Sequence, residues 1–253
     1  GKPVALVASR QGTGSDPLVV EMTHSGLPII DGVTPFLRGV RGLMKYRDFL
    51  RQPAMTAPPA SASEGDKWQS RLAQATVLDE AESLEMLRDF GINANRAAIV
   101  ETEEELVQAA GELQYPLVLK TAAPGLVHKS DHAGVCLNIR DIGDLTDSYR
   151  ELSDRLGPRA LLAPMVGEGV ELILGARRDP QFGPVVLLGF GGVLAEVIGD
   201  VVFALPPFDE EYARRRLNEL ELAPLLKGTR GRPRANVDAY CAMAARFSAM
   251  VEG

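Results

Sequence analysis

The sequence predicts an α/β protein in two parts, and three observations lead to this prediction. Short apolar runs alternate along the chain with longer segments of helical periodicity. A stretch rich in proline, alanine and serine interrupts this alternation between residues 52 and 65. The 253 residues suffice for one large domain or two modest ones, each with its own core. We therefore expect an N-terminal part at residues 1–50, a linker at 51–67 and a larger domain at 68–253.

The N-terminal part has the pattern of strand, helix, strand and helix. This order is typical of a parallel sheet, in which a helix connects successive strands. Two strands make a sheet too small to be stable alone, so we expect residues 1–50 to be the tail of a larger domain. The expected strands are 3–9 and 27–30, and the expected helices are 18–25 and 34–50.

The larger domain continues the alternation without an internal repeat. Gly91 follows one helix at a position suited to a left-handed cap, and Thr102 with Glu105 forms a capping-box sequence for the next. The expected strands are 97–100, 116–121, 134–139, 160–166, 170–176 and 184–190, and the expected helices are 79–90, 102–113, 141–156, 210–220 and 236–251.

Charge and composition argue against several classes of protein. A net charge of -7 repels nucleic-acid backbones, so we expect no nucleic-acid partner. No apolar run is long enough to span a membrane, and the first residues lack the layout of a signal peptide, so we expect a cytoplasmic protein. Cys136 and Cys241 lie far apart and in apolar surroundings, which favours buried, inert thiols over a zinc site or a disulfide.

Two neighbouring segments offer positive charge to an anion. Lys120 ends an apolar strand, where a phosphate is one possible partner and plain solvent is the other. The loop that follows contains Lys129, Asp131 and two of the three histidines of the chain, His128 and His132. His128 has the chemistry of a phosphoryl acceptor that Asp131 could orient. A solvated polar turn is about equally consistent with this loop, and a metal site is the weaker alternative.

Two later segments give weaker indications of a ligand-binding site. Glu171 is placed within an otherwise apolar strand, where an unpaired carboxylate is costly, so we expect it to meet hydroxyl groups or a cation. Gly191 and Gly192 follow a strand and precede Glu196, without the spacing of a dinucleotide-binding motif. Such glycines allow either a close approach to phosphate or simply close packing.

The order of these segments resembles that of a known family. His128–Asp131, Gly169–Pro184, Gly191–Glu196 and Pro224–Gly231 are similar to segments of the ATP-grasp domain of ADP-forming (NDP-forming) acyl-CoA synthetases, which are relatives of succinyl-CoA synthetase. Ser25–Gly32 resembles the end of the ligase subdomain that precedes this domain in fused members. The resemblance implies a two-lobed α+β ATP-grasp domain preceded by the tail of a flavodoxin-like subdomain.

The resemblance also implies a reaction and its partners. In this family an acid, CoA and ATP interconvert with acyl-CoA, ADP and phosphate through acyl-phosphate and phosphohistidine intermediates. The cofactors would be ATP or ADP with Mg²⁺, and the partners would be CoA-binding and ligase domains, the small-molecule acid and CoA, in an oligomer. The principal phosphohistidine would lie in the ligase domain.

Individual residues take their implied roles from the same family pattern. Lys120 would contact the ATP phosphates and Glu171 the ribose hydroxyls, while the strand Leu161–Val166 would offer backbone groups to adenine. His128 would receive the phosphoryl group in relay with the principal histidine, aided by Lys129 and Asp131. The implied nucleotide-binding residues are Lys120, Ala163, Met165, Val166, Glu171, Arg178, Gly191, Gly192 and Glu196.

Three departures from the family pattern bear on activity. Ala133 stands where glycine is usual, and Ala204 stands where arginine is expected. The acidic strand that binds magnesium in the family would lie beyond Gly253, so we expect the chain alone to have little or no synthetase activity. Two alternatives stay open: another ATP-grasp ligase, such as a carboxylate–amine ligase, and a non-catalytic nucleotide-sensing or docking module.

Overall fold

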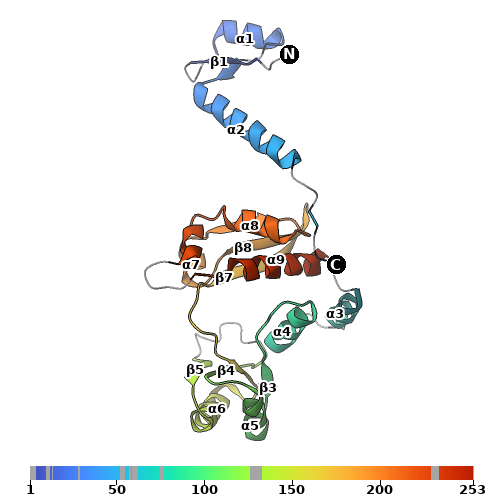
Figure 1. Cartoon of the computed structure of the whole chain (residues 1–253), viewed down its shortest axis with the longest axis vertical. Coiled ribbons are helices and arrows are strands. Elements are labelled where there is room, and N and C mark those ends of the chain that lie inside the picture. The colour runs from blue at the N-terminus through green and yellow to red at the C-terminus, as the bar shows by residue number, and fades with distance from the viewer. Residues whose placement is uncertain are drawn as a thin grey trace. The chain divides into compact units, whose positions relative to one another are not determined.

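A computed structural model describes most of the chain in two compact units, Gly1–Ala54 and Met55–Gly253 (Figure 1). Within the described residues, no helix is long and apolar enough to cross a membrane. The described residues are 4–9, 12, 14–27, 29–51, 55–56, 58, 62–74, 77–125, 133–228 and 234–252.

The first unit contains a parallel pair of short strands, which confirms the predicted parallel arrangement. Leu6 pairs with Ile29, and this register continues for three residues. Asp16 begins the first helix by accepting a hydrogen bond from the Leu18 amide, at 2.9 Å. Among the described residues of this unit, Gly32 alone is buried. The elements are β1 (Leu6–Ala8), α1 (Pro17–His24), β2 (Ile29–Asp31) and α2 (Val33–Leu50).

The second unit begins with a helix that the sequence analysis did not anticipate. Residues 62–67 were expected to belong to the linker, but they form the first half of α3 (Ala62–Gln74). The reason is a long-range anchor: Trp68 is buried, and its indole Nε1 donates to Asp89 at 2.9 Å. Lys67 Nζ also lies 2.6 Å from Asp89. Tertiary contact thus overrides the weak local signal.

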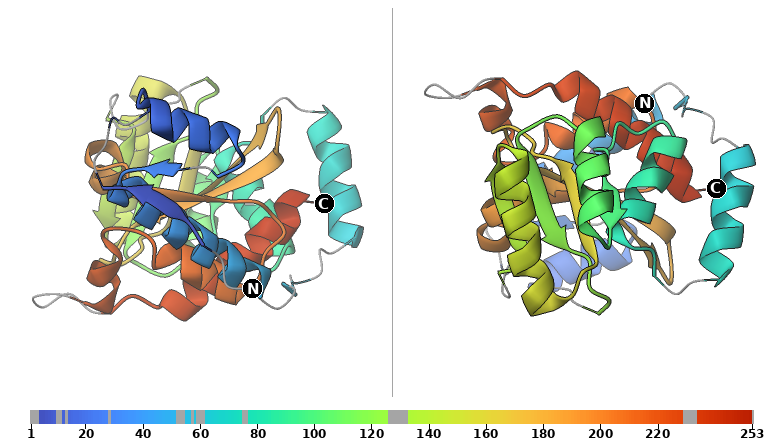
Figure 2. Two further views of the ribbon diagram at one scale, coloured as in Figure 1. Left: turned by 90° about the horizontal axis from the view of Figure 1, so that it is seen from above. Right: turned by 90° about the horizontal axis from the view of Figure 1, so that it is seen from below.

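Residues 80–164 form the first lobe of this unit, built on an antiparallel sheet of order β3-β6-β4-β5. The helices α5 and α6 cover one face of the sheet (Figure 2). Leu117, Leu119 and Leu162 are fully buried in the core on this side. These three leucines form the centre of the lobe's main core. The elements are α4 (Glu80–Asp89), β3 (Ala98–Val100), α5 (Glu103–Glu112), β4 (Leu117–Thr121), β5 (Val135–Ile139), α6 (Ile142–Leu156) and β6 (Ala160–Pro164).

The opposite face of the same sheet has a smaller cluster of buried residues and is partly covered by α4. Val118, Leu161 and Ala163 are buried there, and Ala81 of α4 packs against them. Lys120 pairs with Leu161 and is two residues from Val118, so its side chain shares this face. The strand pattern therefore places a lysine beside the first turn of α4.

Residues 172–252 form the second lobe, with an antiparallel sheet of order β7-β8-β9. One face of this sheet packs against α8 and α9 through buried residues that include Val186, Leu188 and Phe190. The sequence analysis missed α7 and β9, because glycines interrupt the apolar pattern there: α7 begins at Gly192, and Gly199 lies two residues before β9. The elements are β7 (Leu172–Asp179), β8 (Gly183–Phe190), α7 (Gly192–Val197), β9 (Val201–Ala204), α8 (Glu210–Leu217), a 3₁₀-helix (Ala223–Lys227) and α9 (Val237–Glu252).

Both cysteines are shielded, in agreement with their interpretation as inert thiols. Cys241 is fully buried in the core of the second lobe, and burial raises the pKa of its thiol to about 11. Burial also raises the pKa of the half-buried Cys136 thiol. A thiol with a raised pKa carries little thiolate at neutral pH and reacts slowly.

Gly189 marks a close approach between β8 and the start of β9. A Cβ at Gly189 would lie 2.6 Å from the Asp200 carbonyl oxygen and 3.0 Å from the Val201 Cα, both backbone atoms. Gly189→Ala is therefore expected to lower the free energy of unfolding by about 2–3 kcal/mol, measured by urea denaturation. Gly175→Ala, on β7 with no atom near its Cβ position, is the control and should change it by less than about 1 kcal/mol. Equal effects would contradict the steric argument.

Candidate functional site

Lys120 lies at the end of β4 and already has an anionic partner. Its Nζ atom is 2.8 Å from Oε1 of Glu80, which is the first residue of α4. Both side chains are about one-third exposed, at 30% and 34%. A partly desolvated ammonium group needs such a partner, and a phosphate oxygen could replace or join the carboxylate.

The strand end predicted to receive adenine lies on the neighbouring strand, β6. Ala163 is buried opposite Val118, and the Met165 amide donates to the Pro116 carbonyl at 2.8 Å. Val166 is 75% exposed and has no hydrogen-bond partner among the residues that the structure describes. Of the three predicted residues, Val166 therefore has backbone groups available for a ligand.

The register fixes how far this strand end lies from Lys120. Lys120 pairs with Leu161, and Met165 is four residues further along the chain from Leu161. At about 3.3 Å per residue the separation along the sheet is about 13 Å. The arrangement suits an elongated ligand with a base at one end and charged groups at the other.

Glu171 lies in the second lobe, and its environment differs from the prediction. We expected a carboxylate inside a strand, but β7 begins at Leu172 and Glu171 is exposed, so the argument from costly burial does not apply. Its carbonyl accepts a hydrogen bond from the Gly191 amide at 2.8 Å. Its side chain lies against Gly192, where φ is +57°, a left-handed conformation that glycine adopts at little cost. The structure thus brings Glu171, Gly191 and Gly192 together.

Two other predicted residues of the nucleotide site lie elsewhere or are only partly described. Arg178 is seven residues beyond Glu171 on the extended β7 and pairs with Pro184, so it lies about 23 Å from Glu171 along the strand. The structure does not bring these two residues together. Glu196 belongs to α7, but its side chain is outside the described part.

The predicted catalytic residues His128, Lys129 and Asp131 lie outside the described residues. Just after them, Ala133 has φ of 48°, in the left-handed region that glycine adopts more readily. This backbone conformation agrees with the expectation of glycine at that position.

Ala204, the other predicted departure, lies at the end of β9. Its methyl group is buried in the core of the second lobe. A cavity of about 490 Å³ borders it near the turn between β7 and β8, at the end of the sheet away from Glu171. The lining residues are Arg177, Asp179, Phe182, Val185, Phe203, Ala204 and Leu205.

The sequence analysis did not identify the charged residues near Lys120 at the beginning of α4, nor Arg159, which contacts one of them. Asp79 caps α4 and forms a reciprocal capping box with Glu82, whose Asp-x-x-Glu pattern was the available signal. Burial raises the pKa of the Asp79 carboxyl, but hydrogen bonds from the Glu82 amide and from Arg159 outweigh it, so this pKa lies below its usual value. No local signal indicated Glu80 or Arg159, because their partners are distant in sequence.

Within the described residues, no group of three or more histidine, cysteine, aspartate or glutamate side chains could hold a metal ion. These residues therefore do not by themselves form a magnesium site. A nucleotide phosphate would supply further oxygen ligands to the metal.

Comparison with known proteins gives a family match over most of the second unit. A family model described as an ATP-grasp domain matches residues 69–253. The beta subunit of the ADP-forming acetate–CoA ligase II of Pyrococcus furiosus is 33% identical over 190 residues, which span 72% of this chain and 80% of that subunit. A trans-feruloyl-CoA synthase from an unknown prokaryotic organism is 37% identical over 189 residues, which span 72% of this chain but only 27% of that protein.

A solved structure agrees with these sequence matches. The dinucleotide-forming acetyl-coenzyme A synthetase 1 of Ca. Korarchaeum cryptofilum shares 34% sequence identity with this chain, with a TM-score of 0.61 over 70% of this chain and 78% of the other. That structure is a complex with coenzyme A and Mg-AMPPCP, and its phosphohistidine segment points towards the nucleotide-binding site.

Proposed function

Since the chain belongs to the ATP-grasp family and is the ATP-grasp part of an ADP-forming acyl-CoA synthetase, we propose that it binds ATP and ADP through both lobes of its second unit. In the first lobe, Lys120 contacts the phosphates and the backbone at Val166 receives the base. In the second lobe, Glu171 contacts the ribose hydroxyls beside Gly191 and Gly192.

The observation that carries this proposal is the placement of Lys120 and of Met165, which directly precedes Val166, about 13 Å apart along one sheet. The paired strands fix this spacing, so it does not depend on side-chain rotamers. The hydrogen bond from the Gly191 amide to the Glu171 carbonyl supports the second half of the site. The bound Mg-AMPPCP of the Korarchaeum relative supports an adenine nucleotide as the ligand.

The complete synthetase would interconvert an acid, CoA and ATP with acyl-CoA, ADP and phosphate. From its sequence position, we assign His128 as the residue that exchanges a phosphoryl group with the nucleotide, with Lys129 and Asp131 beside it. The phosphohistidine segment of the Korarchaeum relative supports this chemistry. Magnesium would enter with the nucleotide and neutralise its phosphate charge.

Exposed apolar side chains in the first unit indicate an interaction with a partner domain. Large apolar side chains of α2 are exposed, including Leu43, Phe49 and Leu50 at 70%, 61% and 63%. A two-stranded sheet with these exposed groups buries too little apolar surface to be stable alone. We propose that this unit belongs to a flavodoxin-like subdomain and packs against CoA-binding and ligase domains, in an oligomeric enzyme.

Isothermal titration calorimetry of the chain with ADP and with ATP and Mg²⁺ tests the proposed function. We expect saturable binding of both nucleotides, with adenosine binding more weakly because it lacks phosphates. Adding the partner domains should then give acyl-CoA formation that depends on ATP. A folded chain without measurable affinity for either nucleotide would refute the proposal.

A further inference from the structure

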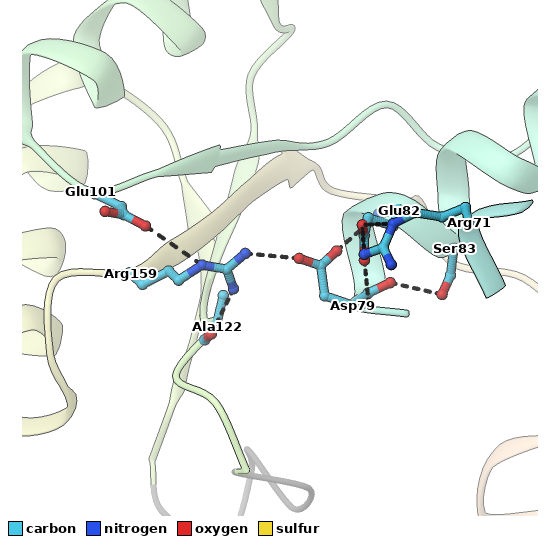
Figure 3. Close-up of polar contacts among 7 residues, drawn as sticks. All are labelled: Arg71, Asp79, Glu82, Ser83, Glu101, Ala122 and Arg159. Carbon is cyan, nitrogen blue, oxygen red and sulfur yellow. Dashed lines mark hydrogen bonds and ion pairs between the residues drawn. The ribbon is translucent and has the colours of Figure 1, made fainter. Parts of the chain in front are cut away.

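Arg159 connects three separate elements at the end of the first sheet (Figure 3). Its Nη1 donates to the Ala122 carbonyl at 2.9 Å, and its Nη2 donates to Asp79 Oδ2 at 2.7 Å. Its Nε lies 3.6 Å from Glu101 Oε1. In return, the Ala122 amide donates to the Arg159 carbonyl at 2.8 Å. One guanidinium group thus links the ends of β3 and β4 to the beginning of α4.

Two of the residues that Arg159 contacts lie next to the proposed phosphate site. Ala122 is two residues beyond Lys120, and Asp79 directly precedes Glu80, the ion-pair partner of Lys120. Any movement of α4 away from β4 would therefore separate Glu80 from Lys120. We propose that Arg159 is a positioning residue of the nucleotide-phosphate site, because it fixes the lysine-bearing end of β4 relative to the first turn of α4. This inference rests on the proposed function.

The contact with Arg159 is not needed to begin the helix. Asp79 uses Oδ1 to accept the Glu82 amide at 2.9 Å, and this hydrogen bond caps α4. The second oxygen, Oδ2, is directed to Arg159 (Figure 3). Glu82 divides its oxygens similarly, because Oε2 accepts the Asp79 amide and Oε1 accepts from Arg71 of α3. The capping box is complete without Arg159, so its guanidinium orients the helix instead of forming it.

The experiment compares ADP and adenosine binding to Arg159→Gln, with the whole chain. A positioning residue for the phosphate site should weaken ADP binding by about tenfold and leave adenosine binding within about twofold. Calorimetry measures ADP binding, and ligand-observed NMR measures adenosine binding. Arg159→Lys keeps the charge but loses the forked geometry, so it should restore part of the ADP affinity.

The matched control is Arg150→Gln, in the same lobe. Arg150 also makes a two-point contact with a carboxylate, at 2.7 and 2.8 Å from Glu103, but it joins α6 to α5 on the other face of the sheet. It should leave the affinities for both ligands unchanged. If Arg159→Gln fails to fold, Asp79→Asn provides the second variant, because asparagine still caps the helix while losing the charge opposite Arg159.

Each outcome decides the inference. Loss of ADP binding with adenosine binding retained supports it. Wild-type ADP affinity in Arg159→Gln, or in Asp79→Asn where that variant is used, overturns it, as does an equal loss of both ligands, which would indicate a purely structural role. Absence of ADP binding by the unchanged, folded chain refutes the proposed function itself and the inference with it.

Discussion

Lys120→Met is expected to weaken ADP binding by about 10- to 100-fold, since a charge-assisted hydrogen bond contributes about 1.5–3 kcal/mol. The substitution keeps an apolar stem of similar length beside Leu161 but removes the ammonium group from the phosphate site. It also removes the 2.8 Å ion pair with Glu80, so that the Glu80 carboxylate repels the incoming phosphates more strongly. Calorimetric titration with ADP measures the loss, and Lys120→Arg should retain part of the affinity.

Lys67→Met is the matched control for the loss of a lysine ion pair. Lys67 Nζ contacts Glu85 and Asp89 at 3.1 and 2.6 Å, so its removal also breaks a contact with α4. It lies on α3 and has no place in the proposed nucleotide site. Nucleotide affinity should stay unchanged in this variant. Wild-type affinity in Lys120→Met, or equal losses in the two variants, would show that Lys120 does not bind phosphate.

The sequence predicted the regular elements well where periodicity extended over many residues. The helices α4, α5 and α6 lie within one residue of their expected limits, because apolar spacing and caps such as Thr102 agree locally. The elements α7 and β9 were missed, because Gly191, Gly192 and Gly199 interrupt the apolar pattern around them. The helix α3 was missed because burial of Trp68, a tertiary effect, stabilises it.

The candidate site was predictable only in part, for a different physical reason. Lys120 and Glu171 stood out because a charged residue beside an apolar run is chemically conspicuous. Their neighbours were not predictable, because Glu80 lies 40 residues from Lys120 and Asp79 lies 80 residues from Arg159. Such pairs depend on how the sheet and α4 pack together, and no local pattern records that. The error at Glu171 came from the strand boundary, since one residue separates a strand interior from an exposed loop.

The second lobe has its own core, and Phe208 provides its test. Phe208 is fully buried among α8, α9 and the sheet, with its ring centroid 5.6 Å from that of Tyr212. Phe208→Ala is expected to lower the free energy of unfolding by about 3–5 kcal/mol, because it removes a large apolar group and leaves a cavity. That loss is a large share of the roughly 5–15 kcal/mol that stabilises a typical domain. Urea denaturation monitored by circular dichroism measures it.

Phe203→Ala is the control variant, because it removes a phenylalanine that is not part of the core. Phe203 precedes Ala204 on β9 and points to the opposite face, where it is 55% exposed, so its removal should cost less than about 1 kcal/mol. In Phe208→Ala the loosened lobe should also bind ADP more weakly, because Glu171 and Gly192 belong to that lobe, whereas Phe203→Ala should bind ADP normally. Similar stability losses in both variants would mean that the two faces of this sheet are equally buried, which contradicts the two-lobed packing on which the nucleotide site depends.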